Sequence, residues 1–292
     1  IETVDFEGPL IFRIEEVPVV VRLHLTETAI RRHFGLKIKG MMLRCEKKQL
    51  SLYPIWIAVS GYSLELTRQT FGLEPTETKT IYYPIHPPVE KNPEIPPLPP
   101  RFVLFAGGRV SRRKGALMLA EAATGFLKKQ NDTSLVFVGS LENENGVPID
   151  QSIRNILGPE LSRRVSFLGQ MSRDQVLAVM RKAAVFAYAS TLETFGLVIG
   201  EAMLQGCPVV VCEIGPNPEF VEHEKTGLMV PPNDPAAFSN AIERLLENKE
   251  LAKRLSQAAL RQVEERFSLE KSVSESVDFY RSLIQLKTES KG

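Results

Sequence analysis

The sequence has no hydrophobic run close to the roughly 20 residues that a membrane-spanning helix needs. It shows no secretory signal, and it does not begin with Met. The formal net charge of the 292 residues is +1, so the chain has neither the basic field that attracts nucleic acid nor an acidic tail. These features favour a cytoplasmic protein with no nucleic-acid partner and no transmembrane segment. Peripheral contact with a membrane stays open.

Cysteine and histidine are both scarce. The three cysteines, Cys45, Cys207 and Cys212, are odd in number and lack the spacing of metal ligands. Cys207 and Cys212 lie in or beside an expected buried strand, which predicts reduced structural thiols and a reducing compartment. No trio of His, Asp, Glu or Cys has metal-binding spacing, so we expect no metal site.

A proline-rich stretch divides the chain. The segment "PIHPPVEKNPEIPPLPP" (84–100) cannot continue a helix or a central strand, because proline lacks the N–H donor and fixes φ. We therefore expect a first, partial domain over 1–86, a stiff linker over 87–100, a second domain over 101–268 and a final helix over 269–292. After the linker, buried apolar runs alternate with helical patterns, which predicts an α/β fold with a parallel sheet. The strand order stays open.

Two motifs follow expected strands of the second domain. In "GGRVSRRKGAL" (107–117), Arg109 and Lys114 could pair with a diphosphate, or the loop could be a solvated basic loop, as we expect for Arg112 and Arg113. The spacing fits neither a P-loop nor the dinucleotide fingerprint, which disfavours a dehydrogenase.

The second motif is "STLETFGLVIGEAMLQGCPVVV" (190–211). It predicts Glu193 in a loop, Gly196 at the start of a helix, and Glu201 one turn into that helix. The start of this helix suits an anion or a sugar hydroxyl. A carboxylate can accept two hydrogen bonds from a vicinal diol. The alternative is two unrelated surface acids.

Together with "LVFVGS", "RVSFLGQMSRDQVLAVMRKAAVFAYAS", "GPNPEFVEHEKTGLMVPPND" and "AIERLL", these motifs resemble the retaining GT-B glycosyltransferases of family 4. The resemblance runs from about Arg101 to the C-terminal helices. It implies two Rossmann-like domains that face each other across a cleft, with the last helix (269–292) crossing back to the N-terminal domain. The second binds a nucleotide-diphosphate sugar (a UDP-sugar favoured, a GDP-sugar next), and the first serves the glycan, lipid-linked or small-molecule acceptor.

The resemblance also implies the role of each site residue. Glu201 would bind the ribose, and Glu193 the transferred hexose. Arg109 and Lys114 would hold the diphosphate and stabilise its charge as it leaves. His24, the last residue of the expected strand "PVVVRLH", would face the sugar from the first domain. The further donor-binding positions are Gly108, Gly139, Leu168, Gly169, Met171, Thr194, Phe195, Gly196 and Leu197, with the base near 168–171. Ser140 departs from the family's pattern.

In this family the leaving phosphate is thought to take the acceptor's proton, so the resemblance implies no cofactor and no required metal. The family's first strand and glycine-rich loop have no counterpart in these 292 residues. We therefore expect an incomplete N-terminal domain. Three alternatives follow: a nucleotide-sugar-binding module without transfer activity, a sugar-nucleotide epimerase, and a phosphorylase, which the length disfavours.

Overall fold

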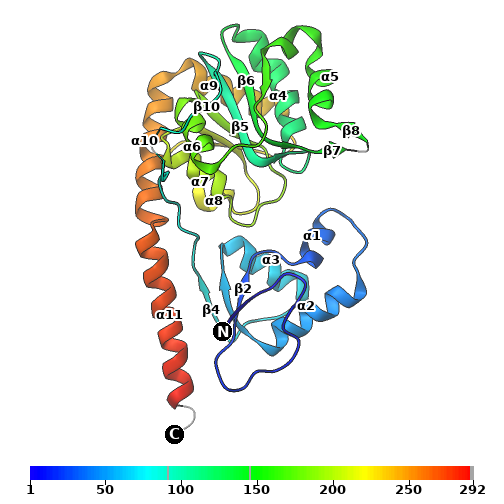
Figure 1. Cartoon of the computed structure of the whole chain (residues 1–292), viewed down its shortest axis with the longest axis vertical. Coiled ribbons are helices and arrows are strands. Elements are labelled where there is room, and N and C mark those ends of the chain that lie inside the picture. Colours follow the sequence, from blue (N-terminus) through cyan, green and yellow to red (C-terminus); the bar gives the residue numbers. More distant parts are fainter. Residues whose placement is uncertain (91, 145, 290–292) are drawn as a thin grey trace. The chain divides into compact units, whose positions relative to one another are not determined.

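The computed structural model describes residues 1–90, 92–144 and 146–289, and the chain divides into two compact units (Figure 1). The first unit consists of Ile1–Pro84 together with the residues from Phe267 on. The second unit is Ile85–Arg266. Each unit is built on a sheet of parallel strands flanked by helices, so the predicted α/β class is confirmed.

The first unit contains a four-stranded sheet in the order β1-β2-β3-β4, with every neighbouring pair parallel. The connection from β1 to β2 is a loop, whereas the connection from β2 to β3 passes through two helices and that from β3 to β4 through one. The strands are β1 (Glu2–Val4), β2 (Val20–Leu23), β3 (Ile55–Ala58) and β4 (Glu77–Thr80), and the helices are α1 (Glu27–His33), α2 (Gly40–Leu52), α3 (Gly61–Phe71) and α11 (Leu269–Glu289).

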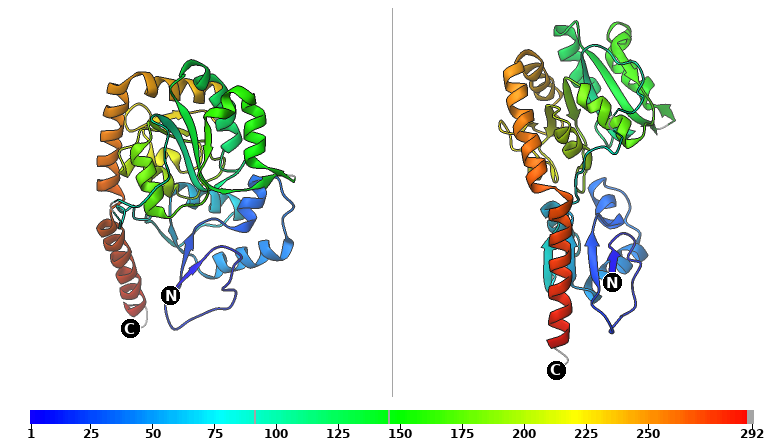
Figure 2. Two further views of the ribbon diagram at one scale, coloured as in Figure 1. Left: turned by 45° about the horizontal axis from the view of Figure 1, so that its top comes forward. Right: turned by 60° about the vertical axis from the view of Figure 1, so that its left-hand side comes forward.

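Helices cover both faces of this sheet. On one face, Trp56 and its neighbours pack with Leu50 and Tyr53 of the α2 region and with Phe71 of α3. On the other face, Phe279 and Leu283 of α11 join a core of strand residues. Figure 2 shows α11 running beside the strands of the first unit. The last helix of the chain thus belongs to the unit that the first residues begin.

The second unit contains a six-stranded parallel sheet in the order β12-β11-β10-β5-β6-β9. The chain enters at β5, proceeds outward to β6 and β9, and then returns to β10 on the other side of β5. The strand order therefore reverses between β5 and β10. The strands are β5 (Phe102–Val110), β6 (Ser134–Leu141), β9 (Val165–Phe167), β10 (Val185–Tyr188), β11 (Val209–Cys212) and β12 (Leu228–Val230).

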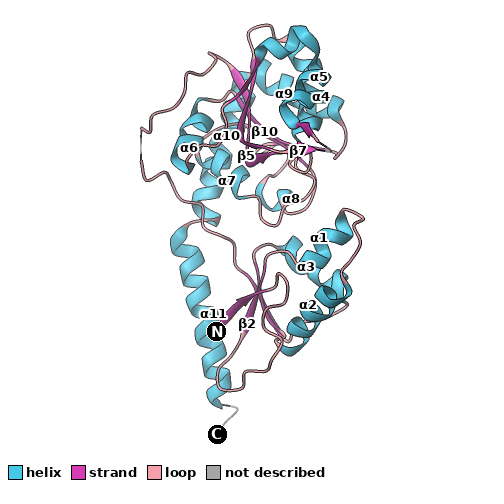
Figure 3. Cartoon of the chain, turned by 45° about the vertical axis from the view of Figure 1, so that its right-hand side comes forward, coloured by secondary structure: helices cyan, strands magenta, loops and turns pink. Residues whose placement is uncertain are grey.

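Helices lie on both sides of this sheet as well (Figure 3). Helix α4 packs against α5 and α9, whereas α7 packs against α10 and α6. The residues at the beginnings of two helices favour a helix start. Ser172 and Gln175 form a capping box at α6, and Asp234 caps α9, whose first residue is Pro235. The elements are α4 (Ala116–Lys129), a small hairpin of β7 (Asn143–Glu144) and β8 (Val147–Pro148), α5 (Ile149–Leu161), η1 (Ser162–Arg164), α6 (Arg173–Lys182), α7 (Leu197–Leu204), α8 (Asn217–Phe220), α9 (Pro235–Glu247) and α10 (Lys249–Arg266).

The proline-rich stretch that we expected to be a linker forms no helix or strand where it is described, and it clusters with the second unit. Its Pro93 is buried. The side chain of Gln175 donates to the carbonyl of Glu94 at 2.8 Å. The first unit ends at Pro84, two residues earlier than the expected boundary, because the chain from Ile85 packs on α7.

Two of the three cysteines lie in or beside a buried strand, β11, as the sequence indicates. Cys207 and Cys212 are buried free thiols, and burial raises the pKa of each to about 12. Both are therefore thiols, not thiolates, at neutral pH. Within the described residues, no helix combines the length and apolar character needed to cross a membrane.

The first prediction concerns Gly115, whose φ is +84° and whose added Cβ would lie 2.0 Å from the carbonyl oxygen of Ala189. Gly115→Ala therefore combines a left-handed backbone with overlap against backbone atoms. We expect it to lower the free energy of unfolding by about 3 kcal/mol, measured by urea denaturation.

Gly206→Ala is the matched control. Gly206 also has a positive φ, +68°, but the space around its added Cβ is open among the described atoms. It should cost only about 1 kcal/mol. Equal losses in the two variants would contradict the close approach at Gly115.

Candidate functional site

The reversal of strand order between β5 and β10 places two loops side by side. Ligands of open parallel sheets bind beyond the carboxyl ends of the strands at such a switch point. Here these are the last part of β5 with the loop that follows it (residues 107–115) and the loop after β10 (residues 189–196), and we call the two stretches the switch-point loops. They contain most of the first motif that the sequence singled out and the beginning of the second.

Hydrogen bonds and a close backbone contact join the switch-point loops. The backbone N–H of Thr191 donates to the carbonyl of Arg113 at 3.0 Å, and the Thr191 hydroxyl donates to the same oxygen at 3.1 Å. Gly115 allows the first loop to approach the carbonyl of Ala189 closely, because a larger residue would overlap it. The relative position of the two loops is thus fixed by backbone atoms.

This arrangement brings Lys114 and Glu193 together, although they lie 79 residues apart. The Lys114 Nζ atom is 2.6 Å from Glu193 Oε1, and the two side chains are only 16% and 11% exposed. The hydroxyl of Tyr188 donates to the same carboxylate oxygen at 2.8 Å. Burial, with the Glu193 carboxylate beside it, raises the pKa of Tyr188 well above its usual value, so the phenol stays a hydrogen-bond donor.

The segment after Glu193 forms the start of α7. Gly196 precedes the helix with φ +89°, and among the described residues no side chain caps it. Phe195 is buried against Phe220, with ring centroids 4.7 Å apart, so its side chain belongs to the core. Leu197 is partly exposed at the first position of α7, and Thr194 is half-buried just before Phe195. The backbone at 194–197 therefore accompanies Glu193 at this edge of the sheet.

Glu201 lies in α7, five residues after Gly196, and it is paired with an arginine that the sequence did not single out. The Nε atom of Arg173 is 2.6 Å from Glu201 Oε1. The same guanidinium donates through Nη2 to the carbonyl of His86 at 2.6 Å. The carboxylate that we expected to bind the ribose is thus held by α6.

The expected base-binding residues are brought together only in part. A small pocket, about 90 Å³, is lined by Gly108, Gly139 and Met171 and by Gln170 and Val176 among others.

The other two expected residues, Leu168 and Gly169, follow β9, and their backbone pairs with β6 instead. The Leu168 N–H donates to Phe137, and the Gly169 carbonyl accepts from Gly139. Those two backbone groups are therefore occupied.

Arg109 does not join the Lys114–Glu193 cluster. Its guanidinium is 2.9 Å from Glu142, a residue between β6 and the β7–β8 hairpin, and the Arg109 side chain is 60% exposed. Arg112 pairs with Glu144 of the same hairpin. Ser140 donates through its hydroxyl to the carbonyl of Gly108. Acidic side chains of this region thus neutralise the basic loop in this structure.

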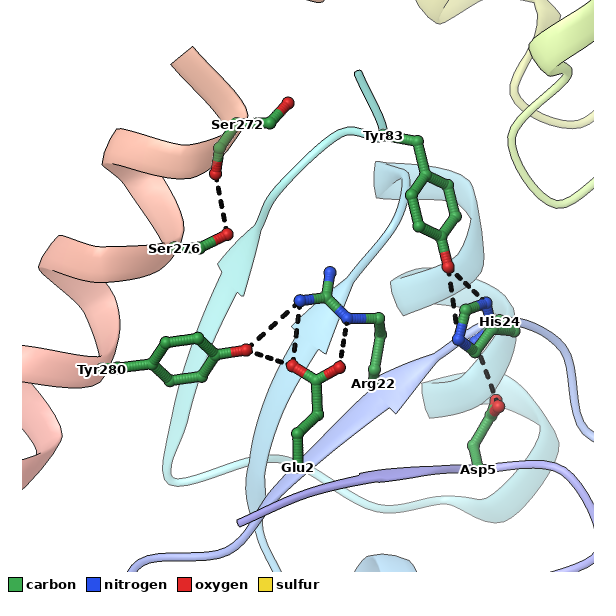
Figure 4. A network of polar contacts seen from close by, with 8 residues as sticks. All are labelled: Glu2, Asp5, Arg22, His24, Tyr83, Ser272, Ser276 and Tyr280. Carbon is green, nitrogen blue, oxygen red and sulfur yellow. Dashed lines mark hydrogen bonds and ion pairs between the residues drawn. The ribbon is translucent and has the colours of Figure 1, made fainter. Parts of the chain in front are cut away.

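His24 lies in the first unit, directly after β2 (Figure 4). The Tyr83 hydroxyl is 2.8 Å from His24 Nδ1, and the His24 backbone N–H donates to Asp5 Oδ1 at 3.0 Å. Burial, and then the nearby Arg22 charge, lower the pKa of the His24 imidazole below its usual value. The imidazole is therefore neutral at pH 7.

Three residues with direct contacts to expected site residues escaped sequence reasoning. They are Tyr83, Arg173 and Tyr188. For Tyr188 a signal existed, because a tyrosine near the end of an apolar strand carries a hydroxyl that needs a partner. For Arg173 the sequence offered only a basic residue after a helix cap. In the described part of the chain, no group of three or more His, Cys, Asp or Glu side chains is placed to hold a metal ion.

With two parallel sheets and the switch-point loops of the second, the chain is an α/β protein of the GT-B class. A family model described as "Glycosyl transferases group 1" matches residues 89–262. This match covers more than half of the chain, and the protein belongs to that family. The resemblance seen in the sequence is therefore confirmed.

Two curated relatives illustrate the similarity. D-inositol 3-phosphate glycosyltransferase of Corynebacterium efficiens is 33% identical over 168 residues, which are 56% of this chain and 39% of that protein. The alpha-1,3/1,6-mannosyltransferase of Homo sapiens is 29% identical over 189 residues, which are 62% of this chain and 45% of that protein. The chain thus spans less than half the length of these relatives.

Solved structures agree in fold. The Anabaena protein HepE, in complex with UDP and glucose, has a TM-score of 0.73 at 23% identity, covering 91% of this chain and 72% of that one. Sucrose-phosphate synthase from Thermosynechococcus elongatus has a TM-score of 0.73 at 24% identity, covering 92% and 68%. The predicted GT-B fold class is confirmed by these neighbours.

A second prediction arises beside His24. Asp5 is 1% exposed, its Oδ2 atom has no hydrogen-bond partner among the described residues, and burial raises its pKa from 3.8 to about 7. Between about pH 4 and pH 7 the unfolded chain loses this proton while the folded protein keeps it. Stability therefore falls as pH rises through that window.

Asp5→Asn removes the ionisation. Relative to wild type, its free energy of unfolding should rise by roughly 3 kcal/mol between pH 5 and pH 8, measured by urea denaturation at each pH. Asp278→Asn, at an exposed position of α11, should show no such trend. A pH-independent difference between Asp5→Asn and wild type would show that Asp5 is ionised in the folded protein.

Proposed function

We propose that the protein is a retaining glycosyltransferase that moves a hexose from a nucleotide-diphosphate sugar to a hydroxyl group of a glycan or other acceptor. The family supports glycosyl transfer. The names of two relatives, an inositol phosphate glycosyltransferase and a mannosyltransferase, support a hexose and glycoconjugate synthesis. A UDP-sugar is our first candidate for the donor, and a GDP-sugar the second.

One observation carries the proposal: Lys114 and Glu193 meet at 2.6 Å at the switch point of the second sheet. A cation and a carboxylate at this edge offer a diphosphate and a polyol their matching partners within one small volume. Both contacts of Glu193 fall on Oε1. We therefore assign Oε2 to the hydroxyl groups of the transferred sugar.

The nucleotide would extend away from this cluster. We assign the ribose diol to Glu201 and the diphosphate to Lys114 and Arg109, with the backbone at 195–197 contacting sugar and phosphate. The base would lie toward the pocket that Gly108, Gly139 and Met171 line. Arg109 would have to exchange Glu142 for phosphate oxygens, which its exposure permits.

In the transfer step, the bond between the anomeric carbon and the phosphate oxygen breaks, and a new bond to the acceptor oxygen forms on the same face of the sugar. The acceptor's proton passes to the departing phosphate. Lys114 and Arg109 stabilise the negative charge that grows on the leaving diphosphate. We propose that neutral His24 contributes hydrogen bonds to the sugar from the first unit.

A binding module without transfer activity is the second candidate. It is favoured by the distribution of the site, since every donor residue except His24 belongs to the second unit. Donor binding would then be intact while no product forms. An epimerase would instead convert the free donor without an acceptor, and product analysis separates the three.

Thermal unfolding in the presence of UDP-, GDP- and ADP-sugars and the matching diphosphates tests the donor. A ligand of the folded state raises the unfolding temperature by mass action, so the correct nucleotide should give a concentration-dependent increase. No increase with any of these nucleotides would overturn the proposal.

The third prediction separates the two carboxylates. Glu201→Gln should weaken nucleoside-diphosphate binding about 10- to 100-fold, because it loses a charge-assisted hydrogen bond to the ribose. Glu193→Gln should leave that affinity within about threefold and lower the transfer rate about 100-fold. Calorimetry and a transfer assay measure the two quantities.

Lys114→Ala should weaken donor binding as Glu201→Gln does. Glu265→Gln, at an exposed position of α10, serves as the control and should match wild type in both assays. Unchanged affinity in both Glu201→Gln and Lys114→Ala would refute the site.

The fourth prediction concerns metal. If Lys114 and Arg109 neutralise the diphosphate, chelation with EDTA should change the transfer rate by less than about twofold. A loss of more than tenfold that one divalent cation restores would contradict this role of the two basic residues.

A further inference from the structure

Three consecutive residues at the start of α6 bind residues that follow the first unit, 85–90 and 92–94, which we call the connecting segment. Arg173 donates to the His86 carbonyl. Asp174 accepts the backbone N–H groups of Val89 and Glu90, at 3.2 and 2.9 Å. Gln175 donates to the Glu94 carbonyl. The start of α6 is itself ordered by its capping box, so these three contacts share one rigid base.

The connecting segment also packs on α7. A Cβ at Gly200 would lie 2.0 Å from the Ile85 Cδ1 atom, so Ile85 rests directly against the helix beside Glu201. Both ends of this contact belong to the second unit. The same stretch of chain is thus held by α6 through hydrogen bonds and by α7 through packing.

Arg173 contacts both the connecting segment and α7. Its Nε atom lies 2.6 Å from Glu201 Oε1, while its Nη2 atom lies 2.6 Å from the His86 carbonyl. The Arg173 side chain is 34% exposed and that of Glu201 is 17% exposed. A guanidinium donates in a fixed plane, so its two contacts determine each other's geometry.

The contact with Arg173 affects how readily Glu201 can bind a ribose. A glutamate without a partner samples several rotamers, and ordering it on binding costs free energy. Arg173 fixes Oε1 and leaves Oε2 and the second lone pair of Oε1 to accept from a diol. Because the same guanidinium is fixed by His86, a displacement of the connecting segment must also disturb Glu201.

We propose that Arg173 is a positioning residue: it orients the Glu201 carboxylate for the ribose diol and couples donor binding to the connecting segment. The inference rests on the proposed function, in which Glu201 is a ligand of the nucleotide. Arg173 itself acts through Glu201 and does not contact the donor.

A double-mutant cycle tests this. Nucleoside-diphosphate affinity is measured by calorimetry for wild type, Arg173→Ala, Glu201→Gln and the double variant, with the nucleotide that the thermal panel selects. Arg173→Ala should weaken binding about tenfold in the wild-type background and less than twofold in the Glu201→Gln background. Arg173→Lys keeps the charge but not the planar fork, so it should recover only a small part of the loss.

Arg181→Ala is the matched control. Arg181 is also in α6, and its guanidinium donates to the Gln205 side chain near the end of α7. This variant removes an arginine contact between the same two helices without touching Glu201. Its nucleotide affinity should stay within twofold of wild type.

Hydrogen exchange gives a readout that a merely structural role would not change. In wild type, saturating nucleotide should slow exchange at the amides of Val89 and Glu90, which donate to Asp174. In Arg173→Ala, nucleotide at saturation should leave their exchange rates unchanged. Equal slowing in both proteins would overturn the coupling.

The outcomes separate this inference from the proposed function. If Glu201→Gln weakens binding and Arg173→Ala does not, the inference fails and the proposed donor site stands. If Arg173→Ala weakens binding equally in both backgrounds, Arg173 acts independently of Glu201, and the positioning role is refuted. If Glu201→Gln binds like wild type, or wild type binds no nucleotide, the proposed site fails and the inference fails with it.

Discussion

The reversal of strand order between β5 and β10 is the constraint on which the rest of the second unit depends. It places the carboxyl ends of two adjacent strands beside each other while sending their chains in opposite directions across the sheet. Gly115 then lets the loop after β5 touch the backbone after β10. Because backbone atoms make this contact, the backbone positions of Lys114 and Glu193 do not depend on the rotamers of these two side chains.

Charge compensation follows from burial at this edge. A half-buried carboxylate without a partner is costly, and the acids at 193 and 201 have a lysine and an arginine respectively. The pairs thus compensate both charges, and under the proposed function they also orient the two carboxylates for the donor. Arg109 differs, since its partner Glu142 is partly exposed and can be exchanged at little cost.

In the first unit, a buried carboxylate beside His24 lowers stability. Asp5 is buried with one oxygen unpaired, yet it accepts the backbone N–H of His24, whose ring Tyr83 contacts. Departures from the usual rule for buried polar groups concentrate at functional sites. The same arrangement that holds His24 in place makes this unit less stable as pH rises toward 7.

Sequence alone determined much of this protein. Sequence patterns predicted the alternation of strands and helices after the proline-rich stretch, the start of α7 at Gly196, and Glu193 and Glu201 on either side of that start, because these features depend on neighbours within a dozen residues. Tertiary structure decided the strand order and kept Arg109 away from both ion pairs. It also joined Arg173 to Glu201 across 28 positions and Lys114 to Glu193 across 79. Local propensity carries no information about such pairs, since they exist only once the sheet has brought the ends of its strands together.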